Sequence, residues 1–331
     1  MCPYPERENR LKSERGFAEL KKLQDAARRK PLEMSRIQQK LEKLLAATVN
    51  KLESEWPPKF AHISPAQYFF RITVNHARHI YNAVCFLFAD KTLKEVGWKW
   101  GYVFVLPPIN RTILDSIFNA VFMLENLEER WPWYCQSGWR EEKEKLERCK
   151  TAYPGLSGWD TWVDLFSEVV QHEIAVLGIS EEKVANPKLI KWWPNPGKML
   201  SPEHKKFLSP PNRRFLQHLN DWFYKEYSSQ AHLGFHGLMT IGAGVLYNTL
   251  DREKREQMER DTLPAFRGRE VTRTVTLLLC LLSEIDHYFK LGLEYRILEL
   301  WLIVNEHTPE IKEIYELRYR DFWPHVLING I

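Results

Sequence analysis

The sequence has few glycines and no paired cysteines, and each shortage narrows the class of protein. Glycine accounts for 15 of the 331 residues, whereas an all-β or doubly wound fold of this length would need more glycine for its turns. The five cysteines form no Cys-x-x-Cys pair, and their number is odd. This pattern disfavours a disulfide framework or a zinc site and indicates reduced thiols in a cytoplasmic protein.

The chain also lacks an apolar signal region at its N-terminus and a long uninterrupted apolar run. Its two most apolar stretches are residues 233–250 and 274–282. The second is too short to span a bilayer, and the first is interrupted by His236 and several glycines. We therefore expect both stretches to be buried helices, and we expect no membrane partner.

Positive charge is concentrated near the N-terminus. The net charge is +4, and residues 1–60 alone contain 14 Lys or Arg against 9 Asp or Glu. A polar helix is expected from about residue 6 to residue 30, followed by an amphipathic helix that ends before Trp56. We interpret residues 1–60 as a charged helical extension, which is a candidate arm for a homodimer.

The remaining residues, 61–331, predict one helical bundle domain. Apolar residues recur at intervals of three and four residues, as on one face of a helix. No segment combines the alternation of a strand with the turn residues of a hairpin. The fold class expected is therefore all-α, a single large multi-helix bundle with an N-terminal extension. The helices expected in this domain cover residues 64–89, 109–130, 139–151, 159–177, 211–232, 235–249, 251–261, 270–305 and 309–322.

Polar side chains recur every four residues along three segments that are otherwise apolar. Residues four apart lie on one helical face, so each set would form a polar strip on a largely buried helix. An unpaired polar group there would cost about 1–3 kcal/mol, so the strips should face one another or a cleft. We expect a polar site between these helices, with a structural hydrogen-bond network as the alternative. The strips are Arg111, Asp115 and Asn119; Tyr224, Ser228, His232 and His236; and Arg71, Asn75, His79 and Asn82.

Two of these strips resemble an uncharacterised prokaryotic family of all-helical proteins. Its members pair an Arg-x-x-x-acid helix with a Tyr…Ser…His helix, which residues 110–115 and 224–232 match. The resemblance covers about residues 65–300, and it departs from the family where an aspartate replaces glutamate. No activity follows from it. The site that it implies consists of Arg111, Asp115, Ser228, Ser229 and His232.

The chain also resembles the helical ribonucleases of the HEPN superfamily, in which an arginine and a histidine separated by four to six residues act on RNA. The best-placed match is Arg71 with His76, because it lies on a polar helix. The resemblance implies that Arg71 holds a phosphate and His76 transfers protons, roles that suit both side chains. Two further matches are Arg213 with His218 and Arg320 with His325.

Residues 186–217 predict a long loop, with six prolines and seven basic residues against one acidic residue. Basic residues mixed with aromatic ones are suited to single-stranded nucleic acid, because cations bind phosphates and rings stack on bases. The alternative is a connection whose tryptophans pack in the core. The candidate nucleic-acid-binding residues are Lys191, Trp192, Trp193, Lys198, Lys205, Lys206, Arg213 and Arg214.

Metal chemistry has weaker support in the sequence. His232 and His236 have the i, i+4 spacing of two ligands on one helix, and Glu284-x-x-His287 has the spacing of a di-iron motif, of which two copies are needed. Phosphate-binding glycine loops and a nucleophile elbow are absent. We expect no metal and no cofactor, and a metal-binding helical-bundle enzyme remains a second alternative.

The leading hypothesis is a prokaryotic defence- or toxin-type protein, a metal-independent ribonuclease or another enzyme for a phosphate-bearing substrate. Arg111 and Arg71 would hold the phosphate, His232 or His76 would transfer protons, Asp115 would orient Arg111, and segment 186–217 would grip the strand. The alternative is a non-catalytic interaction protein whose polar strips are structural. A catalytic site requires Arg111 and His232 to converge on an open pocket, whereas a structural network would be sealed.

Overall fold

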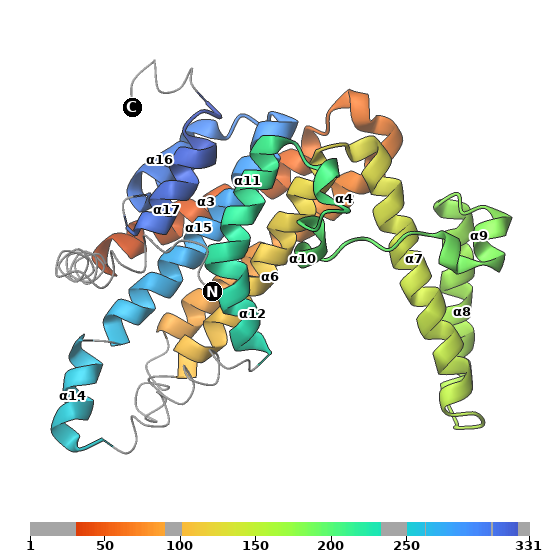
Figure 1. Ribbon diagram of the computed structural model, residues 1–331, viewed down its shortest axis with the longest axis horizontal. Coiled ribbons are helices and arrows are strands. Elements are labelled where there is room, and N and C mark those ends of the chain that lie inside the picture. The colour runs from red at the N-terminus through yellow and green to blue at the C-terminus, as the bar shows by residue number, and fades with distance from the viewer. Residues whose placement is uncertain (1–30, 90–100, 233–249, 262, 306, 324–331) are drawn as a thin grey trace. The chain divides into compact units, whose positions relative to one another are not determined.

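The structure is a computed structural model that describes residues 31–89, 101–232, 250–261, 263–305 and 307–323 (Figure 1). These residues form helices and loops and contain no strand, which confirms the all-α prediction. The helices expected at 6–30 and 235–249 lie outside the described residues. The chain divides into two compact units, one formed by Met1–Val121 with Ser209–Ile331 and the other by Phe122–Leu208.

The first unit contains most of the helices. Its elements are α3 (Pro31–Ser54), η1 (Pro58–Ile63), α4 (Ser64–Ala89), α6 (Gly101–Leu124, whose last turn belongs to the second unit), α11 (Pro210–Leu219), η4 (Asn220–Tyr224), α12 (Lys225–Ala231), α14 (Arg252–Asp261), α15 (Leu263–Phe289), α16 (Glu294–Val304), α17 (Pro309–Ile314) and η5 (Tyr315–Tyr319).

Helix α15 is the centre of this unit. Every side chain from Glu270 to Asp286 is buried except that of Val271, which is half-buried, and the run includes the apolar stretch 274–282. A helix that is apolar on all sides must be surrounded by other helices. Helices α3, α4 and α16 pack against it, as predicted for a buried helix.

Helix α3 packs within this unit, against α4, α15 and α16. Its buried residues Ile37, Leu41, Leu44, Leu45 and Leu52 recur at helical spacing and cover one face. The observed division therefore differs from the one expected at residue 60: α3 contributes to the core of the first unit, and the second unit is an insertion between α6 and α11.

Several expected helix boundaries were wrong. The helix expected at 109–130 is α6, which begins earlier, at Gly101, contains Pro107 and Pro108, and ends at Leu124. The helix expected at 139–151 is α7, which begins at Leu127. The single helix expected at 270–305 is two helices, because Lys290 and Gly292 adopt left-handed backbone conformations with φ of 58° and 69°. The chain turns there between α15 and α16.

The segment expected as one helix at 211–232 is continuous but not uniform. Between α11 and α12 the backbone forms the π-helical turn η4, in which the Lys225 N–H donates to the carbonyl oxygen of Asn220, five residues earlier. A second π-helical turn, η5, follows α17. Such turns insert one extra residue into a helix and often occur at functional sites.

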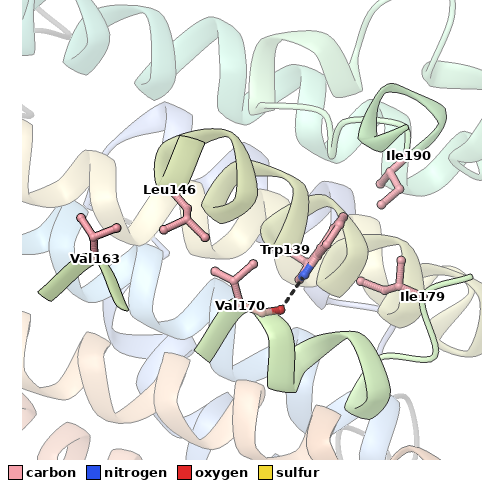
Figure 2. Close-up of a cluster of buried hydrophobic side chains, with 6 residues drawn as sticks. All are labelled: Trp139, Leu146, Val163, Val170, Ile179 and Ile190. Atoms are coloured by element: carbon pink, nitrogen blue, oxygen red, sulfur yellow. Dashed lines mark hydrogen bonds between the residues drawn. The ribbon is translucent and has the colours of Figure 1, made fainter. Parts of the chain in front are cut away.

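The second unit is built on the hairpin of α7 (Leu127–Ala152) and α8 (Trp159–Val176), followed by α9 (Glu181–Ala185), η2 (Pro187–Leu189), α10 (Pro196–Met199) and η3 (Lys205–Phe207). Its core contains Trp139, Leu146, Val163, Val170, Ile179 and Ile190 (Figure 2). The indole N–H of Trp139 donates to the carbonyl oxygen of Val170 at 3.0 Å and joins α7 to α8. Asn126 caps α7 by accepting from the N–H of Glu129.

None of the helices in the described ranges is both long and apolar enough to cross a membrane. The four cysteines that the structure describes, Cys85, Cys135, Cys149 and Cys280, all have free thiols. Cys280 is buried, and burial raises the pKa of its thiol. The fifth, Cys2, lies outside the described residues.

Candidate functional site

Arg111 of α6 is the centre of a polar cluster in the first unit. Its Nη1 donates to Oγ of Ser228 at 2.9 Å and lies 2.9 Å from Nε2 of His232. Its Nη2 donates to the hydroxyl of Tyr224 at 2.8 Å, and the guanidinium also lies over the Tyr224 ring. Two of the predicted polar strips therefore meet, and we call these residues, with Asp115, the Arg111 cluster.

The positive charge of Arg111 is poorly compensated within this cluster. Its three hydrogen-bond partners, Tyr224, Ser228 and His232, are neutral groups. The carboxylate of the cluster belongs to Asp115, whose Oδ2 lies 3.9 Å from Nε of Arg111, beyond hydrogen-bond distance. A fixed guanidinium with neutral partners is suited to receiving an anion.

Asp115 is itself in an unfavourable position for a charge. Its Oδ1 is buried and accepts no hydrogen bond. Burial raises the pKa of the Asp115 carboxyl, and the neighbouring Arg111 opposes this only in part. Asp115, which was expected to orient Arg111, pairs with its Nε at 3.9 Å, while the guanidinium donates its hydrogen bonds to Tyr224, Ser228 and His232.

The contact between Arg111 and His232 determines the tautomer of the imidazole. A guanidinium N–H can only donate, so Nε2 of His232 must present a lone pair and the ring proton must lie on Nδ1. The Nε2 lone pair is therefore a proton-accepting group beside the cation.

The Arg111 cluster reaches solvent. The Arg111 side chain is 20% exposed and that of Asp115 is 40% exposed, and His232 lies on the surface at the end of α12. Arg111 and His232 thus meet at a part of the surface that solvent reaches, unlike the members of a sealed network.

A second polar network contains Asn110 and Tyr227, the residues directly before Arg111 and Ser228 on the same helices, and it is closed to solvent. Asn110 accepts a hydrogen bond from Thr274 at 2.7 Å and donates to the Tyr227 hydroxyl at 3.4 Å, and Tyr227 donates to Glu270 at 3.2 Å. All four side chains are buried. Glu270 also pairs with Arg273, whose other partners are Glu226 and Glu310. This network joins α6, α12, α15 and α17, and its role is structural.

Ser229 has no contact with the Arg111 cluster among the described hydrogen bonds. It lies one residue beyond Ser228 and is half-buried, and consecutive residues point about 100° apart around a helix. Its inclusion in the expected site has no geometric support.

The third predicted strip faces a different helix. Arg71 forms an ion pair with Glu53 of α3 at 2.6 Å and stacks on Tyr68, while Arg78 pairs with Glu42. His76 is exposed on α4. These contacts join α4 to α3, and none of them involves the Arg111 cluster.

The other two arginine–histidine matches have separate partners. His218 is buried, with Nδ1 3.5 Å from Glu313 and its ring 6.2 Å from that of Trp222. Arg320 forms an exposed pair with Asp321. His325 lies outside the described residues.

The basic segment expected as one nucleic-acid-binding loop is divided between the two units. Lys191, Lys198, Lys205 and Lys206 are exposed in the second unit, whereas Arg213 and Arg214 lie on helix α11 of the first. The segment is also less loop-like than expected, since it contains η2, α10, η3 and most of α11.

The two tryptophans of this segment have different environments. Trp193 is half-buried and packs edge-on against Phe122, Trp133 and Tyr134, and its backbone N–H donates to Ser137, so its ring is engaged within the second unit. Trp192 is exposed, and the guanidinium of Arg140 lies 4.1 Å from its ring centroid. Only Trp192 of this pair could stack on a base.

The described residues contain no group of three or more His, Cys, Asp or Glu side chains placed to hold a metal ion. Glu284, from the Glu-x-x-His motif, binds Arg318 through both oxygens at 2.9 and 2.7 Å and accepts from Tyr319. The other half of the candidate histidine pair, His236, lies outside the described residues.

Sequence reasoning placed Tyr224 on a polar strip but not in the site, although it is a direct partner of Arg111. The four-residue repeat that it shares with Ser228 and His232 was the available signal. Asn110 could not be separated from Arg111 by spacing, because which of two adjacent polar residues is sealed depends on the packing of α15.

No protein family matches the chain, and no curated protein sequence and no solved structure is similar to it. The resemblances to the prokaryotic helical family and to the HEPN ribonucleases stay predictions.

Proposed function

We propose that the Arg111 cluster binds a phosphate group and that the protein acts on a phosphate-bearing substrate, for which single-stranded RNA is the first candidate. The observation that supports this most is the guanidinium of Arg111, fixed by three neutral partners within 2.9 Å and open to solvent. Phosphate oxygens would accept charged hydrogen bonds from the guanidinium, which the Asp115 carboxylate at 3.9 Å does not.

The neighbouring groups are suited to phosphoryl chemistry. Cleavage of RNA requires one group that takes the proton of the attacking hydroxyl and another that gives a proton to the leaving oxygen. Nε2 of His232 presents a lone pair for the first role. Tyr224 carries a hydroxyl proton at neutral pH and is the candidate for the second, and burial raises its pKa and makes it a weaker acid than a free tyrosine.

The test is cleavage of end-labelled single-stranded RNA by the full-length protein, with and without EDTA. Arg111→Ala should weaken RNA binding at least about tenfold, since a charged hydrogen bond contributes about 1.5–3 kcal/mol. His232→Gln should abolish cleavage while leaving binding within about threefold of wild type. Arg252→Ala, which removes an exposed arginine of α14, is the matched control and should behave as wild type.

A second measurement separates the phosphate site from the RNA hypothesis. Pyrophosphate should raise the Tm of wild type and of Arg252→Ala but not of Arg111→Ala, because a ligand that binds only the native state stabilises it. A Tm rise without RNA cleavage would retain the phosphate site and reject RNA as the substrate. If neither effect depends on Arg111, the proposal fails and the cluster is structural.

The prokaryotic defence or toxin role stays a prediction from the sequence. The rival, a non-catalytic interaction protein, is favoured by a separate observation, an apolar surface on helix α8.

A further inference from the structure

Helix α8 has apolar side chains on two faces. The inward face packs Val163 and Val170 against α7 (Figure 2). On the outward face, Trp162, Leu165, Val169 and Val176 are 39%, 58%, 52% and 63% exposed. We call these four residues the α8 stripe.

The α8 stripe has the geometry of a helix-packing surface. Its residues are spaced by three, four and seven, so they lie on one side of the helix and extend over about 20 Å. A surface helix normally buries a single apolar face, and a second one indicates an interaction site. Trp162 is held in place by stacking on Trp159 at 4.9 Å and by contact with Phe166 at 5.2 Å, as an anchor residue requires.

The charged residues that helix α8 itself places beside the α8 stripe are acidic, and Lys145 of α7 lies over the Phe166 ring. Helix α8 contains four acidic residues and neither lysine nor arginine. At 100° per residue, His172 and then Glu168 lie along one edge of the stripe, with Asp164 farther around the helix, and Glu173 lies along the other edge. The pKa of Glu173 is raised, mainly by burial and also by the nearby Glu142, so additional positive charge would be favourable there.

These charges discriminate between possible occupants. A second copy packed through the same face would place acidic edges against acidic edges, and an anionic membrane would repel them. A helix with an apolar stripe and basic edges would complement both features.

We propose that the α8 stripe binds an amphipathic helix of a partner protein, with apolar residues at positions i, i+3 or i+4, and i+7 and with lysine or arginine on both sides. This role is independent of the Arg111 cluster. It assigns an adaptor function to the second unit.

The test uses the full-length protein and two labelled synthetic 18-residue helices. Both peptides carry the same leucine stripe, one with lysine edges and the other with glutamate edges, and binding is measured by fluorescence anisotropy. The basic peptide should bind with micromolar Kd, and the acidic peptide should bind at least tenfold more weakly.

Three variants locate the binding. Val169→Asp should weaken the basic peptide at least tenfold, and Asp164→Lys combined with Glu168→Lys should reverse the preference in favour of the acidic peptide. Leu189→Asp, at another exposed apolar residue of the same unit, should have no effect. Val169→Asp should also keep the Tm of wild type, because the stripe faces solvent.

Four results would overturn the proposal. Equal binding of both peptides would indicate unspecific apolar contact, and binding of neither would exclude the docking role. Self-association that Val169→Asp abolishes would identify a second copy as the occupant. A lower Tm of Val169→Asp would show that the chain itself covers the stripe.

Discussion

Asn110 and Arg111 are consecutive in α6, yet Asn110 accepts a hydrogen bond from the buried Thr274 while Arg111 reaches the exposed His232. The same division occurs on α12, where Tyr227 belongs to the sealed network and Ser228 to the Arg111 cluster. Two adjacent faces of the α6–α12 pair therefore have different environments. One fixes the packing of the first unit, and the other presents a cation to solvent.

This division predicts different effects for two tyrosines. Tyr227→Phe leaves Asn110 and Glu270 with unpaired buried atoms and should lower the free energy of unfolding by about 1–3 kcal/mol. Tyr224→Phe removes a bond that water can replace and should cost less than about 1 kcal/mol. Chemical denaturation of both variants measures the difference, and equal losses would contradict it.

The buried Arg273 should be essential for folding stability. Arg273→Met leaves Glu226, Glu270 and Glu310 without their shared cation, and removing one partner of a buried pair costs about 3–5 kcal/mol. Arg269→Met removes a more exposed cation that contacts two of the same carboxylates and should cost about 1 kcal/mol or less. A thermal denaturation series in which both variants lose the same stability would reject this assignment.

Asp286 predicts a pH dependence. Burial is the main cause that raises the pKa of its carboxyl from 3.8 to about 6, and the charge of Glu294 raises it further. The hydrogen bond from the Leu293 N–H and the charges of Lys290 and Lys51 lower the pKa but only in part. The native state therefore takes up a proton as pH falls through 6, whereas the unfolded chain does so only near 3.8. Protonation of Asp286 therefore raises the free energy of unfolding as pH falls from about 6 towards 3.8, and it contributes nothing above pH 6.

Asp286→Asn keeps an oxygen for the Leu293 N–H and carries no charge. At pH 7 we expect it to be at least as stable as wild type. Between pH 7 and pH 4, wild type should gain about 2 kcal/mol relative to this variant. Urea titrations at both pH values test this, and a constant difference would show that the pKa is not raised.

Lys290 should be replaceable by glycine with a gain in stability. Its φ of 58° is a left-handed conformation that costs a side-chain-bearing residue about 1 kcal/mol, and glycine adopts it freely. Lys290→Gly should therefore raise the free energy of unfolding by up to about 1 kcal/mol. Lys225→Gly is the control, because helical backbone at φ of −64° should make it destabilising by a similar amount.

Much of the fold followed from periodicity. Helix α4 was expected at 64–89 and observed at Ser64–Ala89, and α8 was expected at 159–177 and observed at Trp159–Val176. For α4 the Ser64-Pro65 start and the apolar periodicity agree, whereas α8 was identified by its apolar residues alone. The helix prediction failed in two places. Pro107 and Pro108 lie inside α6, although proline usually begins or ends a helix, and a short turn at Lys290 and Gly292 interrupts the apolar run from 270 to 305.

The site was predicted only in part. Four-residue spacing identified Arg111, Ser228 and His232 as members of facing strips, and they do meet. The same spacing on α4 gave Arg71, which pairs with α3 instead. Periodicity tells which residues share a face, but the neighbour of that face depends on how helices distant in sequence pack.

The π-helical turn η4 ends at Tyr224, and Ser228 and His232 follow it one and two helical turns later. One residue more than an α-helix needs rotates everything after it by about 100°. Which residues contact Arg111 therefore depends on the number of residues in η4 as well as on the chemistry of the side chains. A one-residue deletion between Asn220 and Phe223 would leave every member of the cluster unaltered in the sequence and turn Tyr224, Ser228 and His232 away from the cation.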